Sequence, residues 1–324
     1  MYPRLFIVVP CYNEQEVLPE TARRLKEKTD ALVEARKIAD GSRIVFVDDG
    51  SSDRTWEIIR DLHENDRVFR GIRLSRNRGH QNALLAGLLT VRDEADACLS
   101  MDADLQDDAD AIDAMVDRFL DGTDIVYGVR SARNTDTFFK KATAEGFYKL
   151  MASMGVETVY NHADFRLMSK RALEGLSQFE EKNLFLRGMI PLIGFSHDTV
   201  YYERGERRAG ESKYPFRKMV RFALEGITSL SVEPIRLITR LGFVIFFVSI
   251  VVLIYCLARY FTGHTIQGWT TTVLSVWAIG GLIMISLGVI GEYIGKIYLE
   301  TKNRPRYIVE SYLTDGTARE TGGV

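Results

Sequence analysis

Residues 97–106 read Ala-Cys-Leu-Ser-Met-Asp-Ala-Asp-Leu-Gln. The apolar run 97–101 predicts a buried strand, and two carboxylates, Asp102 and Asp104, follow it at once. Two carboxylates one residue apart at the carboxyl end of a strand can share a divalent cation, and their hard oxygen atoms suit Mg²⁺ or Mn²⁺. A cation held there can in turn bind a diphosphate. We therefore expect this stretch to supply both a strand of a sheet and a metal site.

Strands and helices alternate on both sides of this stretch. Apolar runs predict further strands at 5–10, 43–48 and 125–129, and another strand is expected near 69–74. Helical periodicity predicts helices at 14–28, 81–92 and 108–120, and Ser52 and Asp53 are expected to cap another helix after the second strand. This alternation predicts an α/β fold, with a Rossmann-like, mainly parallel sheet and helices on both of its faces.

Polar clusters follow three of the predicted strands, at Pro10–Glu14, Asp48–Ser52 and Asp102–Gln106. The second could simply be a turn, since Asp, Gly and Ser all suit turns. Because ligands bind outside the carboxyl ends of parallel strands, the convergence of the three clusters favours one binding site. A carboxylate at the second strand end could accept hydrogen bonds from a nucleobase or a ribose. The segment 75–81 adds the cation Arg76 near a predicted helix start, where phosphates bind well.

Three further aspartates, Asp107, Asp108 and Asp110, follow the metal-binding stretch. They lie at the predicted start of a helix, so we interpret them as capping and helix-dipole residues rather than ligands. A calcium EF-hand loop is excluded because its sixth position is Asp107 rather than Gly and its twelfth is Asp113 rather than Glu. The chain has neither a P-loop nor a Gly-x-Gly-x-x-Gly sequence, so the common ATP and NAD sites are unsupported.

Two later segments carry candidate site residues. Asp164 precedes a second apolar segment. Residues 203–214 are basic and contain glycine, and Arg204, Arg207 and Lys213 within them could receive a phosphate. The alternative for this basic segment is a solvated loop.

The composition limits the classes of function. The chain has 324 residues, 46% of them hydrophobic, and a formal charge of −2. This length allows about two domains, and the near-neutral charge argues against a nucleic-acid-binding surface. The cysteines Cys11, Cys98 and Cys256 are far apart and are expected to be buried reduced thiols.

Two long stretches, 241–258 and 269–291, contain no charged residue. Each is long enough to cross a hydrocarbon core of about 30 Å as a helix, and the short segment between them predicts an antiparallel hairpin. Basic residues flank both outer ends of the hairpin: Arg236, Arg240, Lys296, Lys302, Arg304 and Arg306. The positive-inside rule then places both termini and the N-terminal domain in the cytoplasm. Two core helices of a soluble protein are the alternative.

Residues 213–238 combine basic and apolar side chains at helical spacing, which favours amphipathic helices at a membrane surface. Helices packed on the N-terminal domain are the alternative. We expect four segments: a domain at 1–212, the interfacial helices at 213–238, the transmembrane hairpin at 239–296 and a cytoplasmic tail at 297–324.

The chain contains the motifs Pro10-Cys-Tyr-Asn-Glu14, Val47-Asp-Asp-Gly-Ser-Ser-Asp53, Asp102-Ala-Asp-Leu-Gln106, Asp164-Phe-Arg-Leu-Met168 and Ala209-Gly-Glu-Ser-Lys-Tyr214. Together these five motifs resemble family 2 glycosyltransferases, and more closely the polyisoprenyl-phosphate glycosyltransferases related to dolichol-phosphate mannose synthase and the bactoprenol glucosyltransferases. The likeness covers about residues 4–300. It implies a GT-A fold, inversion at the anomeric carbon, a nucleotide-sugar donor, Mg²⁺ or Mn²⁺, and an acceptor such as undecaprenyl phosphate.

The resemblance also implies a role for each matching residue. The nucleoside would be held by residues of the first two clusters: Pro10, Tyr12, Glu14 and Asp48. Asp102 and Asp104 would bind the ribose, the diphosphate and the metal, and Gln106 would lie near the sugar. Asp164 matches the residue assigned as the catalytic carboxylate. The phosphates would be held by residues of the basic segment: Arg204, Arg207, Ser212 and Lys213. From its position near a helix start, Arg76 is the further cation expected beside the nucleotide sugar.

The expected reaction is a single transfer at the cytoplasmic membrane face, because the Gln-x-x-Arg-Trp sequence of processive synthases is absent. UDP-glucose is the leading donor, while N-acetylglucosamine, galactose and mannose donors stay open, as does a non-catalytic membrane-tethered nucleotide-sugar binder. The acceptor phosphate has a second pKa of about 6 by analogy with phosphoamino acids, so it is already a nucleophile near neutral pH. Asp164 could therefore be a base or an orienting residue. Members of this branch are often tetramers, so the resemblance implies a possible homotetramer.

Overall fold

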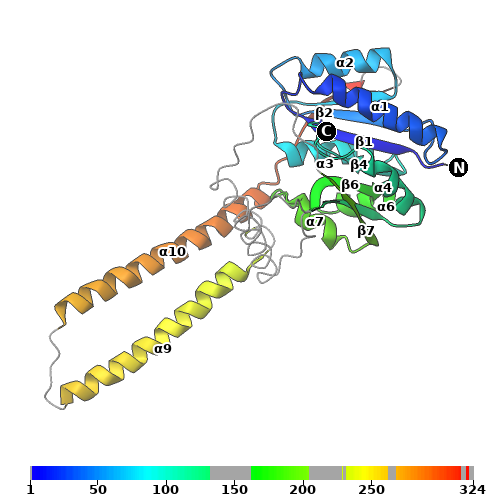
Figure 1. Cartoon of the computed structure of the whole chain (residues 1–324). Coiled ribbons are helices and arrows are strands. Elements are labelled where there is room, and N and C mark those ends of the chain that lie inside the picture. Colours follow the sequence, from blue (N-terminus) through cyan, green and yellow to red (C-terminus); the bar gives the residue numbers. More distant parts are fainter. Residues whose placement is uncertain are drawn as a thin grey trace. The chain divides into compact units, whose positions relative to one another are not determined.

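The computed structural model describes residues 2–131, 162–203, 228, 231–261, 268–314 and 319–320 (Figure 1). The chain divides into two compact units. The first comprises Met1–Tyr148, Glu157–Pro215 and Arg304–Val324, and the second comprises Lys149–Val156 and Phe216–Asn303. Most of the predicted interfacial helices at 213–238 lie outside the described residues, and residues 233–238 begin a long helix of the second unit.

The described part of the first unit contains a nine-stranded sheet in the order β7-β5-β6-β4-β1-β2-β3-β8-β9. Its strands are β1 (Leu5–Cys11), β2 (Arg43–Asp48), β3 (Phe69–Leu74), β4 (Ala97–Ser100), β5 (Ile125–Arg130), β6 (His162–Ser169), β7 (His197–Tyr202), β8 (Val309–Leu313) and β9 (Arg319–Glu320). Its helices are α1 (Leu18–Glu34), α2 (Thr55–Asn65), α3 (His80–Val91), α4 (Ala111–Leu120), α6 (Lys170–Ser177) and α7 (Leu186–Leu192). Among these strands, β6 and β8 run against the direction that the others share.

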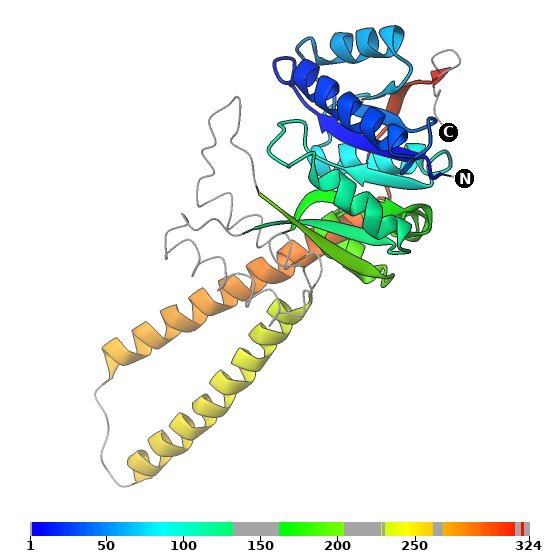
Figure 2. The same ribbon diagram turned by 45° about the vertical axis from the view of Figure 1, so that its right-hand side comes forward.

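Helices cover both faces of this sheet (Figure 2). The central strand β1 is buried along its whole length, and its successive side chains point to opposite faces. On one face Ile7 and Val9 belong to a hydrophobic cluster with residues of α1, α2 and α4. On the other face Phe6 and Val8 belong to a cluster with residues of α3, α6 and α7. The predicted α/β fold, with a mainly parallel sheet between two layers of helices, is confirmed.

Two helices begin later than their sequence pattern predicts. α1 begins at residue 18 rather than 14 because residues 14–17 form a turn, in which the Val17 N–H donates to the Glu14 carbonyl (3.1 Å). α4 begins at residue 111 rather than 108 because the Asp108 carboxylate accepts the N–H of Asp110 (2.9 Å). Such local side-chain bonds compete with helix formation.

Strand β6 was not predicted, and it corrects the expected position of Asp164. β6 pairs antiparallel with β4, so that Ser100 lies opposite Arg166. Because the two strands run in opposite directions, the first residues of β6 lie beside the carboxyl end of β4. Asp164 is therefore inside a strand of the sheet rather than before an apolar segment.

The end of the chain adds a strand to the sheet, which corrects the predicted tail at 297–324. β8 pairs antiparallel with β3, where Tyr312 lies opposite Ile72. The buried guanidinium of Arg70 in β3 donates to the Tyr312 hydroxyl (2.9 Å) and to Glu94 (2.5 Å). β8 therefore covers an edge of β3 whose backbone groups would otherwise be unpaired.

The second unit contains the two long apolar helices α9 (Glu233–Phe261) and α10 (Trp269–Thr301). α10 thus extends beyond residue 296, the predicted end of the hairpin. The segments Glu233–Val252 and Ala278–Thr301 have mean hydropathies of 2.2 and 1.7, and none of the side chains described in them is buried. Both segments are long and apolar enough to cross a membrane. This exposed apolar surface favours a lipid environment over water.

Candidate active site

Three strand ends meet at one edge of the sheet. Cys11, the last residue of β1, pairs with Asp48, the last residue of β2. Val8 of β1 pairs with Ser100, the last residue of β4. The polar clusters at 10–14, 48–52 and 102–106 follow these strands, so they lie at the same edge, as the parallel order predicts.

The predicted nucleoside residues lie at the ends of β1 and β2. Asp48 is fully buried, its Oδ1 accepts the N–H of Ser51 (3.1 Å), and its Oδ2 lies 3.6 Å from the Nε of Arg73. Burial raises the pKa of Asp48, although the Ser51 donors and Arg73 act in the opposite direction. The residues expected to hold the nucleoside are Pro10 and Asp48, which are buried, Glu14, which is half-buried, and Tyr12, which is exposed.

Asp49 fixes the loop that leads into α3. Its carboxylate accepts the N–H groups of Arg78 (2.7 Å) and Gly79 (2.8 Å). Burial raises the pKa of Asp49, while the two N–H donors lower it. Gly50 allows the close approach, because it has a φ of 66° and a Cβ there would lie 2.7 Å from the backbone of Arg76. The predicted cation Arg76 therefore lies beside the second strand end, with its side chain exposed.

Asp102 and Asp104 lie in the loop after β4. The side chain of Asp102 is 35% exposed, although its Oδ1 is buried and has no hydrogen-bond partner. Burial raises the pKa of Asp102 to about 6. The Asp104 carboxylate accepts the N–H of Gln106 (3.2 Å), and Gln106 itself is buried. Leu105 between them has a φ of 53°, which turns the loop back on itself.

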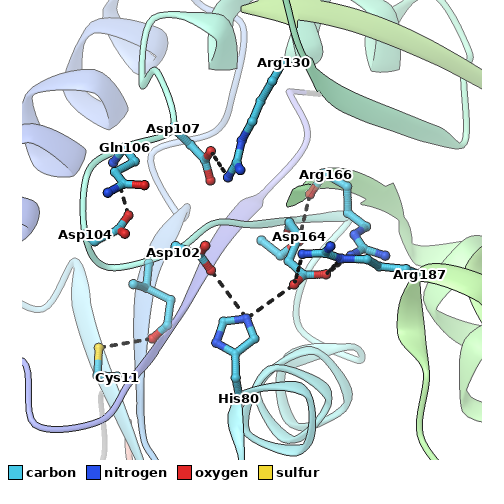
Figure 3. A network of polar contacts seen from close by, with 12 residues as sticks. Cys11, His80, Asp102, Asp104, Gln106, Asp107, Arg130, Asp164, Arg166 and Arg187 are labelled. Carbon is cyan, nitrogen blue, oxygen red and sulfur yellow. Dashed lines mark hydrogen bonds and ion pairs between the residues drawn. The ribbon is translucent and has the colours of Figure 1, made fainter. Parts of the chain in front are cut away.

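Asp164 lies across from this loop and is held by two arginines (Figure 3). Its Oδ1 accepts from the Nη2 of Arg166 (2.5 Å), and its Oδ2 accepts from the Nη2 of Arg187 (3.1 Å). Burial alone raises the pKa of Asp164, but His80 and the two guanidinium groups outweigh it and hold the pKa well below its usual value. Asp164 is therefore a buried carboxylate that stays ionised.

His80, the first residue of α3, lies between the carboxylates of Asp102 and Asp164 (Figure 3). Its Nε2 is 3.4 Å from the Oδ1 of Asp102 and 3.6 Å from the Oδ2 of Asp164. Burial lowers the pKa of His80, but the two carboxylates outweigh it and raise the pKa. The next residue, Gln81, accepts the N–H of Leu186 (2.9 Å) and so holds the start of α7, which carries Arg187.

The interpretation of Asp107 as a helix-capping residue is wrong. Asp107 is buried, and its Oδ1 accepts from the hydroxyl of Tyr202 (2.5 Å) and from the Nη2 of Arg130 (3.1 Å). Arg130 is the last residue of β5 and Tyr202 the last residue of β7. Asp107 therefore ties the loop after β4 to two other strands. Asp110 directly precedes α4, but its carboxylate makes no capping hydrogen bond and instead accepts from Lys28 (2.6 Å).

Sequence reasoning missed the roles of His80, Arg187, Arg130 and Tyr202 in this network. His80 lies in the segment 75–81, which was expected to offer donors to phosphates, so its position was noted but its partners were not. The other three have partners far away in the sequence, and no local pattern marks them. The predicted phosphate-binding residues Arg204, Arg207, Ser212 and Lys213 lie outside the described residues.

The donor set of the loop after β4 fits a hard divalent cation. Within the parts of the chain that the structure describes, no group of three or more His, Cys, Asp or Glu side chains is arranged to hold a metal ion. Asp102 and Asp104 supply two carboxylates from the same loop, and both side chains are partly exposed. Carboxylate oxygens suit Mg²⁺ or Mn²⁺, which commonly take only one or two protein carboxylates and fill their other positions with phosphate oxygens and water.

Residues 6–177 match the family model described as glycosyl transferase family 2. An uncharacterised glycosyltransferase of Bacillus subtilis (strain 168), YkoT, is 51% identical over 308 residues, which are 95% of this chain and 91% of the relative. The bactoprenol glucosyl transferase of Shigella phage SfX is 38% identical over 316 residues, or 95% of this chain and 99% of the relative. Among solved structures, mannosyl-3-phosphoglycerate synthase from Rubrobacter xylanophilus matches with a TM-score of 0.47 and 16% identity, over 74% of this chain and 75% of that chain. So distant a structural match carries no argument about substrates.

Proposed function

The chain belongs to glycosyl transferase family 2, and from this premise we propose that it transfers a single hexose from a nucleotide sugar to a polyprenyl phosphate, with inversion at the anomeric carbon. Relatives of almost the same length are named bactoprenol glucosyl transferases, which supports a polyprenyl phosphate as the acceptor and glucose as the sugar. UDP-glucose is the proposed donor, and donors that carry N-acetylglucosamine, galactose or mannose are the alternatives. The site lies in an α/β domain that is followed in the chain by two apolar helices, which suits a lipid acceptor.

The convergence of the three strand ends on one edge of the sheet carries this proposal. At the ends of β1 and β2, buried Asp48 and exposed Tyr12 would bind the nucleoside, with Arg76 near the phosphates. At the end of β4, Asp102 and Asp104 would hold Mg²⁺ or Mn²⁺ together with the diphosphate. The bound cation would neutralise the charge that develops on the departing nucleoside diphosphate.

Asp164 is proposed to orient its neighbours rather than to take a proton. Its carboxylate is already engaged by Arg166 and Arg187, which hold its pKa well below the usual value after burial has raised it. A phosphate monoester acceptor is mostly a dianion near neutral pH and needs no general base. Asp164 would therefore fix the guanidinium of Arg187, whose side chain is 35% exposed, at the edge of the site.

The membrane position is part of the same proposal. Helices α9 and α10 would form a transmembrane hairpin in the plasma membrane of a bacterium, with the catalytic domain and both termini in the cytoplasm. Basic residues at both outer ends of the hairpin support this orientation by the positive-inside rule. The basic segment with Arg204, Arg207, Ser212 and Lys213 would then receive the phosphate of the lipid.

The direct test incubates the detergent-purified protein and Mn²⁺ with undecaprenyl phosphate and a panel of UDP- and GDP-sugars. Mass spectrometry of the lipid fraction should show a glycosyl phosphate ester with one donor of the panel, together with free nucleoside diphosphate. Asp104→Asn should lose nearly all of this product while keeping the same circular dichroism spectrum. Full activity of Asp104→Asn, or of the wild type in excess chelator, would refute the metal role. Binding of a nucleotide sugar without any lipid product would favour a non-catalytic binder.

A further inference from the structure

The position of His80 between two carboxylates depends on Asp49, the residue that follows β2. The Asp49 carboxylate holds the N–H groups of Arg78 and Gly79 at 2.7 and 2.8 Å. Gly79 has a φ of 87°, a conformation that favours glycine, and α3 starts with the next residue. The His80 ring therefore starts from a fixed backbone position at the edge of the site.

On one side, the His80 ring faces a single oxygen of Asp102. The Oδ1 of Asp102 is buried, has no hydrogen-bond partner, and lies 3.4 Å from the Nε2 of His80. The Asp102 side chain is nevertheless 35% exposed, so side-chain atoms other than Oδ1 reach solvent. His80 thus faces Oδ1, the inner oxygen, while the outer oxygen, Oδ2, points away from the ring (Figure 3).

On the other side, the same nitrogen faces Asp164. The Nε2 of His80 lies 3.6 Å from the Oδ2 of Asp164, the oxygen that also accepts from Arg187. One imidazole nitrogen carries one hydrogen atom, so it can donate fully to only one of the two carboxylates at a time. Among the described residues, His80 is the one whose side chain forms ion pairs within 4 Å with both Asp102 and Asp164.

We propose that His80 is a positioning residue, which orients the outer oxygen of Asp102 toward the divalent cation and joins that carboxylate to the Asp164–Arg187 pair. His80 contacts neither the cation nor a substrate in this role. The inference rests on the proposed function, since it assigns Asp102 to the cation. Neighbours that orient metal ligands typically change metal affinity or activity 10- to 100-fold when they are removed.

The first test measures Mn²⁺ binding alone, by electron paramagnetic resonance of the full-length protein in detergent. His80→Ala should weaken Mn²⁺ binding about tenfold, because Asp102 loses its orienting partner. His80→Gln, whose amide N–H can reach a similar position, should stay within about threefold of the wild type. Electron spin-echo modulation of the bound Mn²⁺ should show no directly coordinated ¹⁴N nucleus. A coordinated nitrogen that disappears in His80→Gln would make His80 a ligand and overturn the proposal, as would wild-type protein that binds no Mn²⁺.

The second test measures steady-state transfer at saturating Mn²⁺. His80→Ala should lower kcat about 10- to 100-fold with little change in KM for the lipid phosphate, and His80→Gln should recover most of the rate. The double variant with Asp164→Asn should lose much less than the product of the two single losses, because both changes break one network. A raised KM for the lipid phosphate at unchanged kcat, or fully multiplicative losses, would overturn the positioning role.

Two controls separate the possible failures. His197→Gln changes an exposed histidine of β7 and should leave Mn²⁺ affinity and kcat unchanged. Thermal unfolding of each variant shows whether the fold is intact, and His80→Gln keeps the test valid if His80→Ala does not fold. If the wild type yields no lipid product with any donor, the proposed function fails, while the Mn²⁺ measurements still decide the role of His80.

Discussion

Asp164 shows how the surroundings of a single residue limit its chemistry. A carboxylate in the position of a catalytic base is expected to have a pKa near the working pH. Burial would raise the pKa of Asp164 toward that range, but His80, Arg166 and Arg187 together hold it well below the usual value. A carboxylate with so low a pKa is ionised throughout the neutral range and is too weak a base to accept a proton there.

Asp164→Asn should therefore slow transfer without changing its pH dependence. We expect kcat to fall about 100-fold, because the amide no longer holds the two guanidinium groups in place. Since the pKa of Asp164 is lowered, the residue does not change protonation above about pH 4, and the pH–rate profile between pH 5 and 9 should keep its shape. The measurement is the pH–rate profile of kcat for the wild type and for Asp164→Asn. Disappearance of an acidic limb in the variant would show that Asp164 acts as a base.

Asp124 is a second buried carboxylate, with a structural role. Its Oδ1 accepts from the hydroxyl of Ser169 (2.9 Å), and its Oδ2 accepts from the hydroxyl of Ser196 (2.8 Å) and from Arg171. Although burial raises the pKa of Asp124, these donors outweigh it and lower the pKa. A carboxylate with a lowered pKa in the folded state stabilises the fold above the pKa of the unfolded chain and loses this effect as the pH falls.

Asp124→Ala should destabilise the catalytic domain by about 1–3 kcal/mol at pH 7, because two hydroxyls and a guanidinium lose their acceptor. The difference from the wild type should shrink as the pH falls below about 3.9, the unfolded value, and through the lower folded pKa. Thermal unfolding in detergent at pH 7 and pH 3 measures both effects. Asp198→Ala is the control, because Asp198 forms an exposed ion pair with Arg118 (3.3 Å). An equal difference at both pH values would contradict the role of the ionised carboxylate.

At the scale of elements, α3 connects the hydrophobic core of the sheet to the candidate site, because it packs on the sheet and carries His80 at its start. The helix carries His80 at its first residue and packs on β1 and β2 through Gly87. A Cβ on Gly87 would overlap Val8 and lie 2.7 Å from the side chain of Val47. The glycine therefore sets how closely this helix approaches the sheet, and hence where the His80 ring lies.

Gly87→Ala should push α3 away from the sheet and lower both stability and transfer. Overpacking of this kind typically costs about 1–3 kcal/mol, more than the helix propensity gained by replacing Gly with Ala. Gly41→Ala is the matched control, since its Cβ would meet nothing nearer than the Arg4 side chain at 3.5 Å. Thermal unfolding and the transfer rate are measured for both variants. A Gly87→Ala variant as stable and active as Gly41→Ala would show that the helix can adjust without moving the site.

The strands that the sequence predicts correctly share one physical property. β1, β2 and β5 are short, mostly apolar runs between turn residues, and burial on both faces requires such runs. β6 was missed because it buries Asp164 and Arg166, a charged pair that local patterns assign to the surface. β8 was missed because Val309–Leu313 follows the second apolar helix and pairs with a strand more than two hundred residues earlier.

The site was predictable to the extent that parallel strands bring their carboxyl ends together. Asp48, Asp102 and Asp104 could be assigned to one edge of the sheet because they lie at the carboxyl ends of two predicted strands. The positions of His80 and Arg187 could not be predicted, because they depend on side-chain directions and on a loop held by Asp49. Such contacts depend on packing between segments that are distant in the sequence, and no local pattern of residue types predicts this packing.

At the scale of the whole molecule, the orientation of the two apolar helices can be tested by labelling. Single cysteines are introduced at Gly268 and Lys302, just before and just after α10, in a chain without its natural cysteines. In intact cells a membrane-impermeant maleimide should label Gly268→Cys and leave Lys302→Cys unlabelled, because the proposed topology has the hairpin spanning the bilayer with both of its outer ends inside. Permeabilised cells should show labelling of both. Labelling of Lys302→Cys in intact cells would contradict the proposed topology.

The pairing of β8 with β3 affects how this protein is made. A ribosome synthesises β1 to β7 early, yet the strand that completes the edge of β3 is translated only after both apolar helices. The catalytic sheet therefore has an open edge during the time in which the helices leave the ribosome, and such edges invite pairing with other chains. Pairing along this edge of β3 therefore has to wait for the translation of β8, which follows both apolar helices. A cell would acquire a transferase with a complete β3 edge only from chains whose synthesis has run past these two helices.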